Sequence, residues 1–103
     1  MKPLYLLAEI YPHPEKIDEA RQLFQELIEQ TLKEPGCLIY ELVSEHGSDH
    51  WIMIEKWESL DAWEKHMETD HVKLANRAAQ GFTRLQTKLR FLDPVEDASF
   101  AIE

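Results

Sequence analysis

Residues 51–79 read WIMIEKWESLDAWEKHMETDHVKLANRAA, and this stretch decides the fold of the chain. Its first part is a short apolar run that ends at Trp57 and predicts a β-strand. Ser59 is a good N-cap for a helix over residues 60–68, and a second helix is expected over residues 71–80. All three tryptophans of the chain lie in this stretch. We therefore expect the walls of any chemical site to come from here.

The segments on either side supply the remaining elements. They are expected as a strand over residues 4–11, a helix over 14–33, a strand over 37–44 and a strand over 83–92. The turn at 45–49 is short enough to make the strands around it an antiparallel hairpin. The order strand, helix, strand, strand, helix pair, strand is the ferredoxin-like split βαβ pattern. The fold class is therefore α+β, with a four-stranded antiparallel sheet, helices on one face, and one domain over residues 1–92.

The sheet is expected to have two covered faces. One face of the strand over residues 4–11 is wholly apolar and should meet the helices. The residues expected on the opposite face are Tyr5, Leu7, Glu9, Tyr11, Met53, Glu55, Trp57 and Arg90. A face with so many apolar side chains should be buried by a second subunit, where Glu9 and Glu55 would form interface ion pairs with Arg90. We thus predict a homodimer with its sheets packed face to face.

The C-terminal tail, residues 93–103, has a polar start and a small apolar end. It suits an edge strand added to the partner subunit at the dimer interface. A frayed end is the alternative, and the sequence leaves both open.

Composition excludes several classes of partner. The 103 residues carry 20 acidic against 11 basic side chains, a net charge of −9, which argues against nucleic acid and anionic membrane surfaces. No apolar run approaches the ~20 residues of a membrane span, and the N-terminal segment lacks a signal-peptide cleavage pattern. The single Cys37 excludes an intramolecular disulfide and is compatible with the cytoplasm. We interpret it as a small buried apolar residue rather than a nucleophile.

Several motifs, taken in order, resemble those of the antibiotic biosynthesis monooxygenase (ABM) family, and of its quinol monooxygenase-like branch in particular. They are Ala8-Glu9-Ile10, Lys33-Glu34-Pro35-Gly36-Cys37, Glu55-Lys56-Trp57-Glu58-Ser59-Leu60, and then Ala62, His66, Thr69, His71 and Lys73. The resemblance covers roughly residues 4–92 and implies a dimeric α+β barrel with a pocket between helices and sheet in each subunit. Characterised members oxidise aromatic polyketides or quinols with dioxygen, without metal or flavin, so no cofactor is expected.

The same family contains heme-degrading enzymes, and this sequence departs from their pattern at three positions. Asn76 stands where that branch has its iron-ligating histidine. Ile10 stands in place of its asparagine on the first strand, and His66 in place of its pocket tryptophan. These departures argue against heme degradation.

His66 and Asn76 are the candidate catalytic residues. His66 lies at the border of an apolar helix face, where a neutral imidazole could take a proton from a phenolic substrate. The alternative is a surface histidine bonded to a carboxylate such as Glu68 or Asp70. Asn76 falls within the inward stripe of its helix, so its amide must face a cavity or bond a nearby backbone carbonyl.

Four residues are expected to contact the substrate. Trp63 is the expected pocket wall, Tyr40 is expected to point its phenol into the same space, and Val72 belongs to the inward stripe. His71 could be a second wall or a residue that helps its helix begin. It lies five positions from His66, about 140° around a continuous helix, so no shared metal is predicted.

The leading hypothesis is a cofactor-independent monooxygenase that oxidises a quinol or a related small aromatic with dioxygen. One alternative is an isomerase of a small phosphorylated sugar, for which only Lys73 and Arg77 are obvious cationic groups. The other is a small-molecule-binding dimer without turnover.

Overall fold

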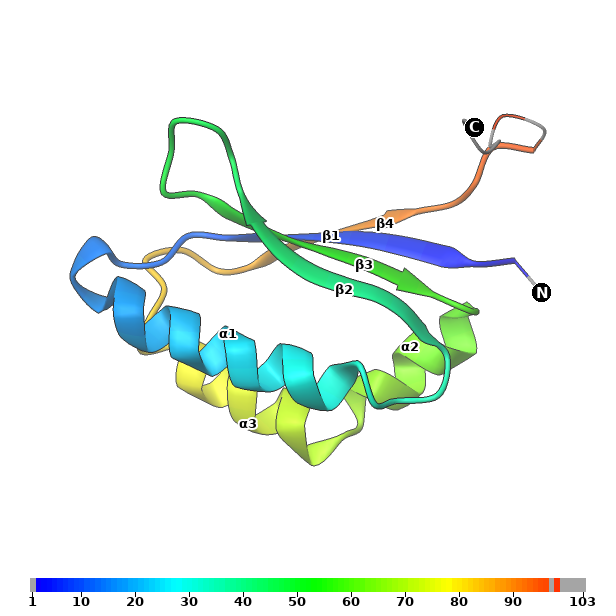
Figure 1. Ribbon diagram of the computed structural model, residues 1–103, viewed down its shortest axis with the longest axis horizontal. Helices are drawn as coiled ribbons and strands as arrows, with labels where there is room; N and C mark the ends of the chain where they lie inside the picture. The colour runs from blue at the N-terminus through cyan, green and yellow to red at the C-terminus, as the bar shows by residue number, and fades with distance from the viewer. Residues whose placement is uncertain (1, 97, 99–103) are drawn as a thin grey trace.

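The computed structural model describes residues 2–96 and 98. Its elements are β1 (Leu4–Ile10), the 3₁₀ turn η1 (Pro14–Lys16), α1 (Ile17–Thr31), β2 (Cys37–Ser44), β3 (Trp51–Trp57), α2 (Leu60–Met67), α3 (Asp70–Ala79) and β4 (Lys88–Leu92). The strands form one antiparallel sheet in the order β2-β3-β1-β4. The three α-helices lie on one face of this sheet, with α1 and α3 side by side (Figure 1). The predicted α+β ferredoxin-like fold is confirmed.

Local sequence explains where the helices begin and which face of α1 is buried. In α1, the buried residues Ala20, Phe24, Leu27 and Thr31 recur at spacings of three and four and form one stripe toward the sheet. The Ser59 side chain caps α2 by accepting from the Ala62 amide at 3.2 Å, as predicted. The Thr69 side chain caps α3 in the same way and separates the two helices.

The pairing of β1 with β3 decides which side chains face the helices. Leu6 lies opposite Glu55, and Ala8 lies opposite Met53. Directly opposed residues in antiparallel strands point to the same face. Met53, Glu55 and Trp57 are accordingly buried under the helices, with exposed fractions of 1%, 4% and 0%. Their expected place on the outer face, and the interface ion pair of Glu55, are wrong.

The outer face of the sheet carries half-buried apolar side chains that none of the described helices covers (Figure 1). These include Tyr5, Leu7, Ile52 and Ile54, which alternate with the inward residues of β1 and β3. Glu9 lies on this face, as predicted, and a carboxylate oxygen of Glu9 lies 3.7 Å from a His50 ring nitrogen.

The last strand is shorter than expected. β4 spans only Lys88–Leu92, because residues 84–87 leave the sheet after an isolated bridge between Pro12 and Thr83. Within the described residues, no helix is both long and apolar enough to cross a membrane. Most of the tail for which an edge strand was considered, residues 97 and 99–103, lies outside the described part.

Candidate active site

A cavity of about 320 Å³ lies between the inner face of the sheet and the helices. It is lined by apolar side chains from six elements, namely Ala8, Phe24, Leu27, Met53, Trp63, Met67, Val72 and Leu89. Trp63 is held edge-on against Phe91 of β4, with ring centroids 4.9 Å apart. For scale, a dry cavity of ~150 Å³ is large enough to take up benzene. The space therefore suits a planar molecule somewhat larger than one ring.

The cavity has two chemically different ends. Tyr40, Glu55 and His66 line one end, where Glu55 is the strand partner of both Leu6 and Tyr40. The other end lies beyond Trp51 and Ile10, where Thr83 bridges to Pro12. Its polar lining consists of uncharged amides and hydroxyls, from Gln80, Thr83, Gln86 and Thr87. Trp51 lies four positions before Glu55 along β3, which is about 13 Å at ~3.3 Å per residue.

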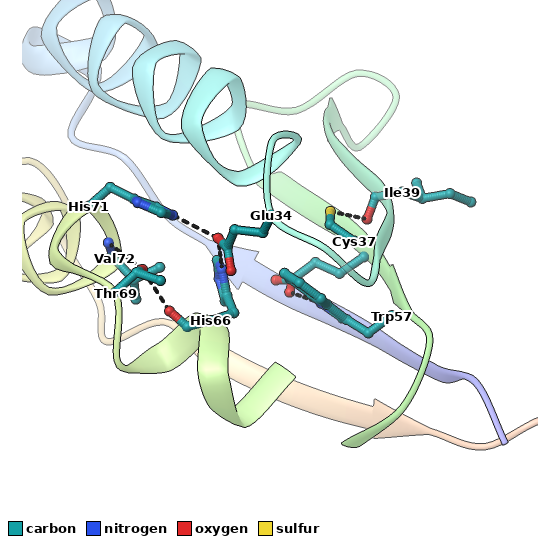
Figure 2. Close-up of polar contacts among 9 residues, drawn as sticks. Glu34, Cys37, Ile39, Trp57, His66, Thr69, His71 and Val72 are labelled. Carbon is teal, nitrogen blue, oxygen red and sulfur yellow. Dashed lines mark hydrogen bonds and ion pairs between the residues drawn. The ribbon is translucent and has the colours of Figure 1, made fainter. Parts of the chain in front are cut away.

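His66 is tied to a carboxylate that sequence reasoning did not single out. Its Nδ1 lies 2.7 Å from Oε2 of Glu34, and Nε2 of His71 lies 2.7 Å from the same oxygen. Figure 2 shows both rings pointing at Glu34, which follows α1, from the end of α2 and the start of α3. The break at Thr69 turns the two histidines toward each other: its hydroxyl donates to the His66 carbonyl at 2.7 Å. Because a cap separates the two helices, the rings of His66 and His71 reach the same carboxylate. One continuous helix would point the two rings in different directions.

These contacts fix the protonation of the His66 ring. An ionised carboxylate can only accept, so Nδ1 of His66 carries the proton and Nε2 keeps its lone pair. Burial lowers the pKa of His66 below 6.5, although the hydrogen bond and the charge of Glu34 act in the opposite direction. His66 is only 2% exposed, and it lines the cavity. It is therefore a neutral imidazole at neutral pH, held in the tautomer that can accept a proton at Nε2.

Glu55 is the second titratable group in the lining. The indole Nε1 of Trp57 donates to its Oε1 at 3.0 Å. Burial raises the pKa of Glu55 to about 7; the indole hydrogen bond lowers it, and the charge of Glu34 adds to the rise. Burial, followed by the charge of Glu55, also raises the pKa of the neighbouring Tyr40 phenol, which stays neutral. This end of the cavity therefore holds proton-transfer groups without a fixed positive charge.

The predicted site residues fall into two groups. His66, Trp63, Tyr40, Val72 and Asn76 all line the cavity, and the Asn76 amide is exposed at its edge. His71, expected as a pocket wall, does not line it: the structure places this ring on Glu34, facing the groove between α1 and α3.

Glu34 and Glu55 are the titratable groups at this site that sequence reasoning did not assign to it. Glu34 lies 32 and 37 residues from its two histidines, so no local spacing could have revealed the contact. A signal for Glu55 was present, because residues 55 and 57 share a strand face and a buried indole needs an acceptor.

Glu34, His66 and His71 are also the residues that could hold a metal. In the part of the chain that the structure describes, they form one group whose ligand-capable atoms lie within 4.8 Å of one another. Two histidines and a carboxylate are a donor set that divalent metals use. At 2.7 Å, however, both nitrogens bond the carboxylate directly, and a cation would have to displace two N–H protons. We assign these contacts as hydrogen bonds.

Comparisons with known proteins agree with the fold. A family model described as "Antibiotic biosynthesis monooxygenase" matches residues 3–78. The Escherichia coli protein "Probable quinol monooxygenase YgiN" is 30% identical over 102 residues, covering 88% of this chain and 97% of that protein.

Two solved structures show the same likeness. One is a conserved protein from Methanosarcina mazei Go1, with a TM-score of 0.86 and 28% identity, covering 89% of this chain and 92% of that one. The other is described as an antibiotic biosynthesis monooxygenase, with a TM-score of 0.84 and 30% identity, covering 89% and 98%. The chain belongs to the antibiotic biosynthesis monooxygenase family.

Proposed function

We propose that this protein is a cofactor-independent monooxygenase that oxidises a quinol or a related small aromatic with dioxygen. The observation that carries the proposal is the buried, neutral His66 in the lining of a cavity whose walls are mostly apolar. Deprotonating a phenolic hydroxyl makes an electron-rich phenolate, which can reduce dioxygen directly. A dry aromatic wall suits this chemistry because it holds a planar ring and keeps water out. The printed name of the Escherichia coli relative points to the same substrate class.

The residues have distinct roles in this proposal. His66 is the general base, and Glu34 and His71 position it by fixing its tautomer. Asn76 donates a hydrogen bond to a substrate or intermediate oxygen at the cavity edge. Trp63, Tyr40 and Val72 are walls that hold the ring. For a simple quinol, the overall reaction is quinol plus dioxygen to hydroxyquinone plus water.

An isomerase of a phosphorylated sugar is less well supported. Such a ligand needs cationic groups, and the described residues that line the cavity include no lysine or arginine. Lys73 and Arg77, the expected candidates, are exposed on α3 away from that lining. A binding protein without turnover remains the alternative that an activity measurement separates.

We further propose that the protein works as a homodimer in the cytoplasm. A second copy packed on the outer face would bury Tyr5, Leu7, Ile52 and Ile54, which the chain itself leaves half-exposed. The cytoplasmic assignment rests on the lone Cys37 thiol.

Oxygen uptake with a panel of one- and two-ring quinols tests the proposed function. We expect the wild-type protein to consume oxygen and form the oxidised product, and His66→Ala to lose most of this activity, by about 10²–10⁴-fold. His46→Ala, at an exposed turn of the hairpin, is the matched control and should behave as wild type. Absence of uptake and of product across the whole panel would contradict the proposal.

A further inference from the structure

Glu55 is a buried carboxyl group without a basic partner. None of the ion pairs in the described part of the chain involves it. Its one hydrogen bond among these residues comes from the neutral indole of Trp57. Carboxylates that are only 4% exposed normally have a cation or several donors, because removing the charge from water is strongly unfavourable.

The groups around Glu55 also favour its neutral form. Tyr40 of β2 and Leu6 of β1 flank it in the sheet, and His66 of α2 faces the same end of the cavity. The charged group that acts on it is Glu34, which is negative and disfavours a second anion nearby. A neutral carboxyl group has an O–H to donate. In this lining it is the only carboxyl among the described residues, and it faces the space that a substrate would fill.

We propose that Glu55 is the proton donor of the cavity and works together with His66 as an acid–base pair. The inference rests on the proposed function and deepens it, since it assigns the step that follows attack by dioxygen. His66 is held ready to take a proton, and Glu55 is held ready to give one. Neighbouring groups whose environments favour opposite proton states are typical of acid and base pairs in enzymes.

The proposed sequence balances in atoms and electrons. His66 takes a hydroxyl proton from the quinol, the phenolate transfers one electron to dioxygen, and the radical pair joins through a new bond from ring carbon to oxygen. Glu55 protonates the outer oxygen of this peroxide. The ring C–H proton then passes to the Glu55 carboxylate, its electron pair forms C=O, and the O–O bond breaks. The departing hydroxide takes the proton from His66 and leaves as water.

Glu55→Gln tests the inference. Glutamine keeps the size and the acceptor for the Trp57 indole but has no acidic proton. We expect kcat to fall by about 10²–10⁴-fold. The phenolate absorption of the bound quinol, measured without oxygen, reports its ionisation. This absorption should be retained in Glu55→Gln and lost in His66→Ala. Glu64→Gln, exposed on α2 and outside the cavity lining, is the matched control and should leave both readouts unchanged.

The dependence of kcat on pH distinguishes a proton-donating role of Glu55 from a purely structural one. In the wild type, kcat should fall as pH rises through about 7, where Glu55 loses its proton. This alkaline limb should be absent in Glu55→Gln. Glu55→Asp, which keeps an acid on a shorter side chain, should retain the limb and part of the activity.

The outcomes separate this inference from the proposed function. Suppose the wild-type protein turns over quinols, but the folded Glu55→Gln variant has the same kcat or keeps the alkaline limb. This result would overturn the role of Glu55 and leave the proposed function standing. A wild-type protein without oxygen uptake would overturn the proposed function itself, and the acid–base pair with it.

Discussion

At the scale of single residues, the site depends on two carboxyl groups with different hydrogen-bond partners, the partly buried Glu34 and the buried Glu55. One carboxylate oxygen of Glu34 lies 2.7 Å from a ring nitrogen of each of two histidines, whereas Glu55 accepts from one neutral indole. The first can hold a base in place, and the second can hold a proton. Neither role follows from residue type, because both side chains are glutamates in the same small domain.

Replacing Glu34 with glutamine should lower the stability of the fold. It should also reduce the preference of His66 for the tautomer with its proton on Nδ1. The neutral amide oxygen is a weaker acceptor, so we expect the free energy of unfolding to fall by about 1–3 kcal/mol. Urea denaturation at pH 7 measures this change, and ¹⁵N NMR of the imidazole reports the tautomer. Glu29→Gln, exposed on α1, makes the same change of charge and should have little effect. Equal stability and an unaltered ring spectrum in Glu34→Gln would contradict the assignment.

Replacing Glu55 with glutamine should change how stability depends on pH. The folded-state pKa of Glu55 is raised from 4.5 to about 7, so its contribution is fully present below pH 4.5 and is lost as pH rises toward 7. The loss is about 3 kcal/mol, from ~1.4 kcal/mol per pH unit. The free energy of unfolding of Glu55→Gln, measured with urea relative to the wild type, should therefore rise by about that much between pH 4 and pH 8. A constant difference across this range would show that Glu55 is not held neutral.

At the scale of elements, the turn after α1 controls how closely β2 approaches α2. Gly36 has φ +89°, and a Cβ there would lie 2.8 Å from the Cβ of Ala62. The Gly36 carbonyl also accepts from the Glu58 amide at 2.9 Å. This turn precedes β2 directly and follows Glu34, so it fixes where that carboxylate meets the two helices.

Gly36→Ala should therefore destabilise the protein more than an ordinary glycine replacement. Gly47→Ala is the control, since Gly47 has a similar φ of +78° but open space around it. We expect Gly47→Ala to lose about 1 kcal/mol from backbone strain, and Gly36→Ala to lose at least 1–2 kcal/mol more from the clash. Thermal or urea unfolding gives both values, and equal losses would contradict a close approach at Gly36.

The elements also show what the sequence could predict and what it could not. Helix caps such as Ser59 and the alternation of β1 are local, and both were predicted. The inward face of β3 depends on its register against β1, and a shift of one residue would reverse it, so Glu55 was assigned to the wrong face. The contacts of Glu34 with His66 and His71 depend on three separate segments meeting, and spacing along one helix could not reveal them.

At the scale of the whole molecule, the sheet has one face under helices and one without them. A homodimer formed through the second face should show a mass near twice 12.2 kDa in light scattering at micromolar concentration. Ile54→Lys places a charge in the middle of that face and should shift the mass to that of one chain. Leu74→Lys, on exposed α3, is the matched change on the helical side and should leave the dimer intact. A wild-type protein with the mass of one chain would refute the interface.

The two ends of the cavity have different structural support, and this difference bears on how the protein can evolve. Tyr40, Glu55 and His66 belong to the regular sheet and to α2, where a replacement disturbs the packing of the domain. Gln80, Gln86 and Thr87 belong to exposed, irregular chain between α3 and β4. Mutations there can change the shape and hydrogen bonding offered to the far end of a ligand at little cost to folding. In the proposed enzyme, substrate preference can thus diverge among descendants of this sequence while the end that holds Glu55 and His66 is inherited intact.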